Sequence, residues 1–145
     1  MKVPFLDLRA QHLAIKREIS AAIASVIDES AFIGGRHVTS FENAFSRMHG
    51  AKYAVGVGNG TDALAVALFS VGVRSGDEVI TVANSFIATS EAISVLGARV
   101  VFADCDDLSY TIDTSLIEEH ITAKTGTIAF VFAVMCSSIK EVSIV

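Results

Sequence analysis

The chain has 145 residues, of which 52% are hydrophobic, with a formal net charge of -5 at pH 7 and a single proline. This length fits one ordinary domain or part of a larger one, and the high apolar fraction excludes an intrinsically disordered chain. The acidic balance, without a basic stripe, argues against a protein that binds nucleic acid through its phosphates.

Cysteine content and the apolar runs narrow the class further. Cys105 and Cys136 are too few for a disulfide framework or a four-cysteine metal site, so reduced thiols are expected. The N-terminus does not resemble a secretion signal, because acidic Asp7 interrupts it. The longest apolar run, Ile128 to Cys136, is far shorter than the roughly 20 residues that cross a bilayer. We therefore expect a cytoplasmic protein with no membrane partner.

Two helices are expected before residue 50. Between about 10 and 28, apolar side chains recur at spacings of three and four, which is typical of an amphipathic helix. Gly34 and Gly35 then break the chain, and a second helix is expected over about 38–48, capped by Thr39 or Ser40. We interpret residues 1–50 as an N-terminal helical segment, either an extra lobe or an arm used in oligomers.

Strands and helices alternate from residue 51 onward. Most of the strands are continuous apolar runs, which is typical of a parallel sheet covered on both faces by crossover helices. Residues 51–145 are therefore predicted to form an α/β domain with a mostly parallel sheet and flanking helices. The expected strands are 53–57, 78–82, 98–103 and 127–134, and the expected helices are 61–71, 85–96 and 115–121.

The turn between the first strand and its helix is rich in glycine, at alternate positions from 56 to 60. The first N–H groups of a helix lack intrahelical partners and the helix dipole favours an anion, so the amides of Gly60, Thr61 and Asp62 could bind a phosphate. The alternative is that Asn59 or Thr61 only caps the helix. The spacing matches neither the dinucleotide fingerprint nor a P-loop.

Two further strand ends carry candidate residues. Ligands of open parallel sheets gather at the carboxyl ends of strands, and Phe86 could stack there on a flat ring. The local pattern alone favours Phe86 in the hydrophobic core, with Asn84 and Ser85 as helix caps. The carboxylates of the Asp104–Asp107 segment could bind a divalent cation, but without other ligands we expect a solvated turn and no metal.

Several blocks of sequence together resemble a known family. They are Pro4-Phe5-Leu6-Asp7-Leu8, Phe32-Ile33-Gly34-Gly35, Ala54 to Leu64, Gly76-Asp77-Glu78-Val79-Ile80, Ser85 to Thr89, and Tyr110-Thr111-Ile112-Asp113. In these blocks the chain is similar to the N-terminal portion of the DegT/DnrJ/EryC1/StrS aminotransferases. These are pyridoxal-phosphate (PLP) enzymes, most of which make amino sugars from nucleotide-linked keto-sugars. The resemblance implies a partial PLP-transferase fold of type I, like that of aspartate aminotransferase, with an N-terminal helical arm.

The resemblance also implies roles for individual residues. Gly60, Thr61 and Asp62 match the loop that holds the cofactor phosphate, and Phe86 matches the aromatic residue that stacks on the pyridine ring. The family relationship further implies a nucleotide-sugar substrate, an amino-acid donor, and a homodimer whose sites form between two subunits, near the segment Phe32–Gly35.

The chain departs from the family after Ile128. There the family pattern Pro-Val-His-aromatic-Gly is replaced by Ala129 to Met135. The Schiff-base lysine and the carboxylate on the pyridinium nitrogen lie further along in the family. The neighbouring residues of the Schiff-base lysine in the family are matched by none of the lysines of this chain, which are Lys2, Lys16, Lys52, Lys124 and Lys140. We therefore expect an N-terminal fragment from a frameshifted or truncated gene, without the catalytic lysine, inactive alone and prone to aggregate.

Two other functions stay open at this point. A non-catalytic module could bind a phosphorylated ligand, or could pair with a full-length homologue through the N-terminal helices. An NAD-binding module is disfavoured, because the glycine spacing is wrong and the strand ending at Val82 leads into Ala83-Asn84 with no acidic residue.

Overall fold

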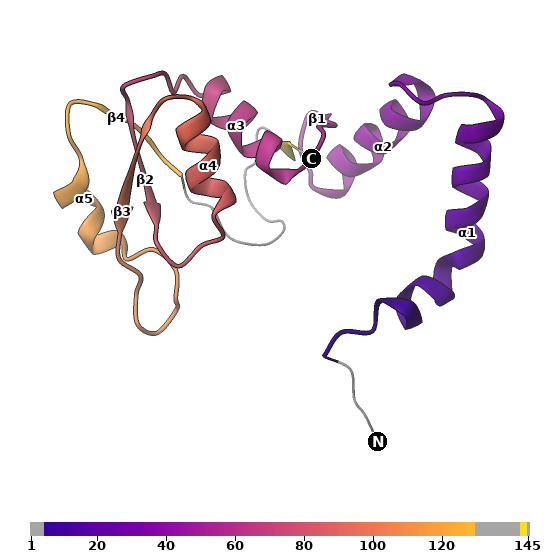
Figure 1. The fold of residues 1–145 in the computed structure, drawn as a ribbon, viewed down its shortest axis with the longest axis horizontal. Helices are drawn as coiled ribbons and strands as arrows, with labels where there is room; N and C mark the ends of the chain where they lie inside the picture. Colours follow the sequence, from indigo (N-terminus) through magenta and orange to yellow (C-terminus); the bar gives the residue numbers. More distant parts are fainter. Residues whose placement is uncertain (1–4, 130–142, 145) are drawn as a thin grey trace. The chain divides into compact units, whose positions relative to one another are not determined.

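The computed structural model of the protein describes residues 5–129 and 143–144 (Figure 1). The chain divides into two compact units, Met1–Phe41 and Glu42–Val145, which are described separately here. The division falls inside a helix. The domain limits expected from the sequence, 1–50 and 51–145, stay a prediction.

Helix α1 (Leu8–Asp28) confirms the amphipathic helix expected from the apolar periodicity. It begins where the Asp7 carboxylate accepts a hydrogen bond from the Ala10 amide at 2.9 Å, an N-cap that satisfies one otherwise unpaired donor. None of the side chains of α1 is buried.

Helix α2 (Gly35–Met48) starts earlier than the sequence predicts. Gly34 and Gly35 have φ of 58° and 80°, a left-handed conformation that suits glycine, and the chain enters the helix directly from them. Thr39 and Ser40 therefore lie inside α2, and the prediction that one of them caps it is wrong.

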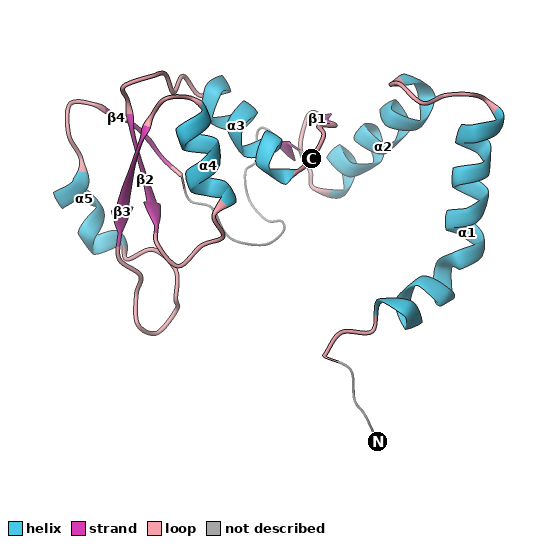
Figure 2. Ribbon diagram, in the orientation of Figure 1, coloured by secondary structure: helices cyan, strands magenta, loops and turns pink. Residues whose placement is uncertain are grey.

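Strands β2 (Glu78–Val82), β3 (Arg99–Ala103) and β4 (Thr125–Ile128) form a parallel sheet in the order β3-β2-β4 (Figure 2). The central strand β2 is buried along its whole length, as its continuous apolar sequence predicts. A separate parallel pair joins β1 (Ala54–Val55) to β5 (Ser143–Ile144). The rest of the expected strand 127–134, from residue 130 onward, lies outside the described residues.

Two crossovers connect the three strands of this sheet. Helix α4 (Ala88–Val95) joins β2 to β3, and η1 (Thr114–Leu116) with α5 (Ile117–His120) joins β3 to β4. The connection from β2 to β3 and the connection from β3 to β4 run in opposite directions across the sheet. Because both crossovers are expected to be right-handed, α4 and α5 lie on opposite faces of the sheet. Figure 1 shows them on opposite sides of the strands.

Helices α3 (Gly60–Ser70) and α4 cover one face of the sheet. The core on this face joins Leu68 of α3, Val79 of β2 and Ala92 and Ile93 of α4, with Val73, all 7% exposed or less. Burying each leucine, isoleucine or valine side chain of this core contributes about 1.5–3 kcal/mol. The opposite face buries Ile117 of α5.

The buried carboxylate of Glu78 connects the amino ends of the strands in this sheet through hydrogen bonds. It accepts hydrogen bonds from Arg99 Nη2 at 2.5 Å and from Thr122 Oγ1 at 2.7 Å. The bond from Arg99, followed by that from Thr122, lowers the pKa of Glu78. One side chain of β2 thus holds both β3 and the turn before β4. No helix within the described ranges is long and apolar enough to cross a bilayer.

Candidate functional site

The junction between β1 and α3 is a capped helix N-terminus. Asn59 has an extended backbone, and its Oδ1 accepts a hydrogen bond from the Asp62 amide at 2.9 Å. Its Nδ2 also donates to Asp62 Oδ2 at 2.9 Å, so the two side chains hold each other. The capping interpretation of Asn59 is therefore confirmed.

This cap decides which amides remain available to an anion. The Asp62 amide is taken by Asn59 Oδ1, and the Ala63 amide donates to the Asn59 carbonyl at 3.0 Å. Within residues 5–129, the amides of Gly60 and Thr61 have no hydrogen-bond partner. Two amides and the Thr61 hydroxyl are thus free to bind an anion at the positive end of the α3 dipole.

Two contacts around this turn were not predicted from the sequence. A Cβ at Gly58 would lie 2.8 Å from Asp62 Oδ2, so a side chain here would displace the Asp62 carboxylate from its place beside Asn59. The Gly56 amide donates to Glu42 Oε1 at 2.8 Å, which ties the end of β1 to α2. The Glu42 and Gly56 partners are fourteen residues apart in the sequence, and no local sequence pattern predicts this contact.

Phe86, on the loop between β2 and α4, is 74% exposed. The local prediction that it fills the core is wrong, because α4 begins only at Ala88 and the buried positions go to Ala88 and Thr89. The exposed ring follows the carboxyl end of β2, where ligands of open sheets bind. It is free to stack on a flat ligand.

Asn84 and Ser85 are not helix caps. The residue before α4 is Ile87, which makes no side-chain cap, and the Asn84 side chain instead donates from Nδ2 to the Tyr110 carbonyl at 2.9 Å. The Ser85 hydroxyl is hidden from solvent and has no hydrogen-bond partner among residues 5–129.

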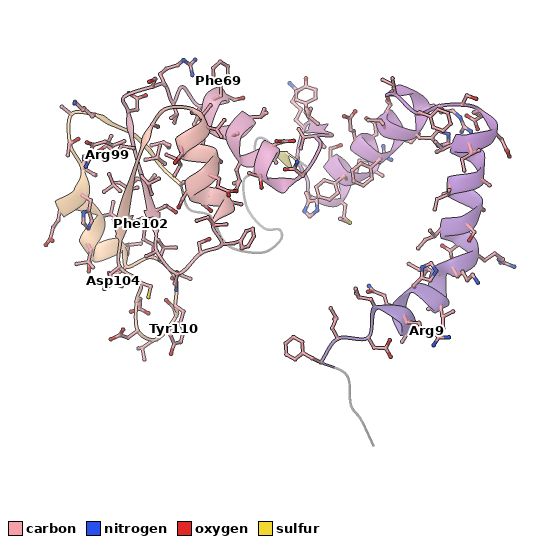
Figure 3. All side chains as sticks on the ribbon, viewed as in Figure 1. Arg9, Phe69, Arg99, Phe102, Asp104 and Tyr110 are labelled. Carbon is pink, nitrogen blue, oxygen red and sulfur yellow. The ribbon has the colours of Figure 1, made fainter. Side chains whose placement is uncertain are left out.

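The acidic segment after β3 forms a tight turn, as expected. Asp106 Oδ1 accepts hydrogen bonds from the amides of Ser109 at 2.7 Å and Leu108 at 3.2 Å, and the Ser109 amide is the main cause that lowers the pKa of Asp106. Asp104 Oδ1 accepts from the Cys105 amide. Figure 3 shows Tyr110 on this loop, beyond the Asp104 end of β3 and away from Arg99. In the described ranges, no three or more His, Cys, Asp or Glu residues gather in a way that could hold a metal ion.

These two features fit different parts of a phosphorylated aromatic cofactor. The free amides at the start of α3 suit its phosphate, and the exposed ring of Phe86 suits its flat face. No hydrogen bond or ring contact within residues 5–129 joins the 60–62 segment to Phe86. Each feature is thus positioned by its own element.

The fold of this chain matches solved structures, among them DesV of S. venezuelae and the ntda protein of Bacillus subtilis. The family model for the DegT/DnrJ/EryC1/StrS aminotransferase family matches residues 13–137. The chain belongs to this family, and both the resemblance and the fold class expected from the sequence are confirmed.

Two curated relatives are named as sugar transaminases. The chain is 41% identical over 129 residues to the dTDP-3-amino-3,6-dideoxy-alpha-D-galactopyranose transaminase of Aneurinibacillus thermoaerophilus, covering 89% of this chain and 36% of the relative. It is 40% identical to the UDP-2-acetamido-2-deoxy-3-oxo-D-glucuronate aminotransferase of Pseudomonas aeruginosa, over 87% of this chain and 35% of the relative. The chain therefore spans about a third of the length of the relatives that it matches.

Two solved structures carry the same relationship. DesV of S. venezuelae, in complex with a ketimine intermediate, has a TM-score of 0.83 and 39% identity, covering 86% of this chain and 33% of that one. The ntda protein of Bacillus subtilis, with bound cofactor PMP, has a TM-score of 0.78 and 33% identity, covering 86% and 29%. A pyridoxal phosphate cofactor is thus confirmed for the family.

Proposed function

We propose that this chain serves the PLP-dependent transfer of an amino group from an amino acid to a nucleotide-linked keto-sugar. The observation that carries the proposal is the family match over residues 13–137, together with relatives named as transaminases of dTDP- and UDP-linked sugars. A homodimer in the cytoplasm belongs to the same proposal, and the unburied apolar side chains of α1 support the dimer.

Gly60 and Thr61 would hold the cofactor phosphate through their free amides and the Thr61 hydroxyl. When bound, PLP supplies an electron sink for moving the amino group. Asp62 would act on the phosphate indirectly, because its amide and carboxylate both bond to Asn59 and fix the turn. Asn59 Nδ2 holds the Asp62 carboxylate in one position through a charge-assisted hydrogen bond.

Phe86 would cover one face of the pyridine ring and exclude water from it. Its side chain is 74% exposed and follows the carboxyl end of β2. A stacked pair of aromatic rings is worth about 0.5–1.5 kcal/mol beyond the area that it buries.

We also propose that these 145 residues alone do not transaminate. Lys124 precedes β4 at the amino end of the parallel sheet, where its carbonyl accepts the Glu78 amide. This is the opposite end of the strands from Phe86. Lys52 has its Nζ 5.1 Å from the centre of the Tyr53 ring, and Lys16 belongs to α1 in the other compact unit. Lys2 and Lys140 lie outside the described residues.

The test is a PLP titration of the purified 145-residue chain, followed by borohydride reduction and peptide mass spectrometry. We expect saturable binding of PLP, no stable adduct on a specific lysine, and no amino transfer from glutamate to a nucleotide-linked keto-sugar. A stoichiometric adduct at one lysine would contradict the proposal that the chain alone is inactive.

The same titration separates the two other functions. Binding of inorganic phosphate with no preference for PLP would favour a non-catalytic phosphate-binding module. Binding of neither ligand, combined with a stable complex with a full-length homologue in size-exclusion chromatography, would favour a hetero-oligomerising fragment.

A further inference from the structure

Two loops at the carboxyl end of the sheet are joined by one side chain. Asn84, on the loop that carries Phe86, donates from Nδ2 to the Tyr110 carbonyl of the Asp104–Asp113 loop at 2.9 Å. No other hydrogen bond within residues 5–129 connects these two loops.

The acceptor loop is held firmly by its own bonds. The Tyr110 amide donates to the Asp106 carbonyl at 2.9 Å, the Asp106 amide donates to the Thr111 carbonyl at 2.8 Å, and the Asp106 carboxylate accepts two further amides. Cys105 and Ile112 form an antiparallel bridge at the base of the loop.

Within this loop Tyr110 adopts a φ of 55°, a conformation unusual for an aromatic residue. Such a backbone persists only where the surroundings determine it. Here the hydrogen bonds of the Tyr110 amide and of the neighbouring Thr111 carbonyl fix this backbone. The Tyr110 carbonyl that accepts from Asn84 therefore has a fixed position.

The donor loop has fewer restraints near Phe86. The Phe86 carbonyl accepts the Thr89 amide at a long 3.3 Å, and the exposed ring has little packing of its own. Asn84 is two residues before Phe86, so its anchored side chain restricts the backbone that carries the ring.

We propose that Asn84 is a positioning residue that fixes the Phe86 ring at the carboxyl end of β2 by anchoring its loop to Tyr110. The inference that the fixed ring stacks on PLP rests on the proposed function. The anchoring itself is measurable without the cofactor.

The chain contains no tryptophan, so a Phe86→Trp variant carries a single fluorescent reporter at the ring position. In this background we compare Asn84→Asp, which keeps the side-chain shape but removes the donor, with Asn84→Gln, which keeps an amide donor. The matched control is Asn43→Asp, the same chemical change at an exposed residue of α2 whose side chain makes no hydrogen bond with the described residues.

We expect Asn84→Asp to lower the fluorescence anisotropy of the indole and to speed amide hydrogen exchange across residues 83–87 by about tenfold, the factor for one lost hydrogen bond. Asn84→Gln should restore most of the anisotropy. Asn43→Asp should change neither readout, and the melting temperature should stay within about 3 °C in each variant.

Unchanged anisotropy and exchange in Asn84→Asp, or an equal loss in Asn43→Asp, would overturn the proposal. If Asn84→Asp does not fold, Asn84→Ala is measured in its place, with the same expected loss. Quenching of the indole by added PLP is recorded in parallel. Absence of quenching with the Asn84 side chain intact counts against the proposed function, while the anisotropy still decides the role of Asn84.

Discussion

Gly60 is the first residue of α3, and its amide is one of the two free donors at the proposed phosphate site. Proline is favoured at the first position of a helix because the amide that it lacks has no intrahelical partner there. The extended backbone of Asn59, with φ of -167° and ψ of 176°, is compatible with a following proline. A Gly60→Pro variant therefore removes one donor and leaves the helix intact.

We expect Gly60→Pro to weaken PLP binding by roughly ten- to a hundredfold, because a hydrogen bond to a charged group is worth about 1.5–3 kcal/mol. The free energy of unfolding should not fall. Gly60→Ala is the matched control, since it keeps the amide and its Cβ would meet no atom within 4 Å. Equal PLP dissociation constants for the two variants would show that the amide of Gly60 does not contact the phosphate.

Ser30 carries backbone strain at the end of α1. Its φ is 52°, its amide donates to the Ile27 carbonyl, and the Ala31 amide donates to the Val26 carbonyl. This is a helix ending in which glycine is the usual residue. We expect Ser30→Gly to raise the free energy of unfolding by about 1 kcal/mol.

The measurement for Ser30→Gly is urea unfolding followed by circular dichroism at 222 nm. The control is Ala24→Gly inside α1, which should cost about 1 kcal/mol because the helix interior disfavours glycine. If both variants lower the stability, the left-handed conformation of Ser30 carries no strain.

At the scale of elements, the corner between α1 and α2 is held by the Glu29 carboxylate. It accepts hydrogen bonds from Arg36 Nε at 2.7 Å and Ser25 Oγ at 2.8 Å, and it also pairs with Arg36 Nη2. His37 Nε2 lies 3.3 Å from the same carboxylate. The bond from Arg36, followed by that from Ser25, lowers the pKa of Glu29 to about 2.

Because the pKa of Glu29 is lower in the folded chain than its ordinary value of 4.5, its stabilising effect is complete above pH 4.5. The effect is lost as the pH falls towards 2. We expect Glu29→Gln to be less stable than the wild type at pH 6, with the difference shrinking by pH 2.5, in thermal unfolding. Glu18→Gln, which removes a carboxylate that makes no ion pair with the described residues, should show no such convergence.

Local pattern predicts the elements that are defined by their own periodicity. Helix α1, strand β2 and the start of α3 follow from apolar spacing, a continuous apolar run and an asparagine cap. The starts of α2 and α4 differ from those that the local pattern predicts, because they depend on backbone conformation and tertiary burial. The positive φ of Gly34 and Gly35 sets the start of α2, and the burial of Ala88 and Thr89 sets the start of α4.

At the scale of the whole molecule, the site stays a prediction, and the structure shows the geometry of its candidate residues. Gly60 and Thr61 offer the free amides that helix geometry predicts, but the Asp62 amide is taken by Asn59. The exposure of Phe86 contradicts the burial that its local pattern predicts and leaves the ring accessible to a ligand. The Asn84–Tyr110 bond spans 26 residues, and contacts of that range leave no periodic signal in a single sequence.

Helix α1 carries an apolar stripe that stays exposed in the described chain. Leu13, Ile23 and Ile27 are 55–57% exposed, and α1 buries none of its residues. Apolar surface of this kind marks a site of association. We therefore expect the purified chain to self-associate, with a weight-average sedimentation coefficient that rises with concentration in the micromolar range.

Replacing Ile23 and Ile27 together by lysine should abolish this concentration dependence. The free energy of unfolding should change by no more than about 0.5 kcal/mol per substitution, because neither side chain is buried. The matched control replaces the exposed Ala14 and Ala21 by lysine, which adds the same charge away from Leu13, Ile23 and Ile27 and retains the stripe. Association lost in both double variants would mean that net charge controls it, and a monomer at every concentration in the wild type would show that the stripe of α1 needs no partner.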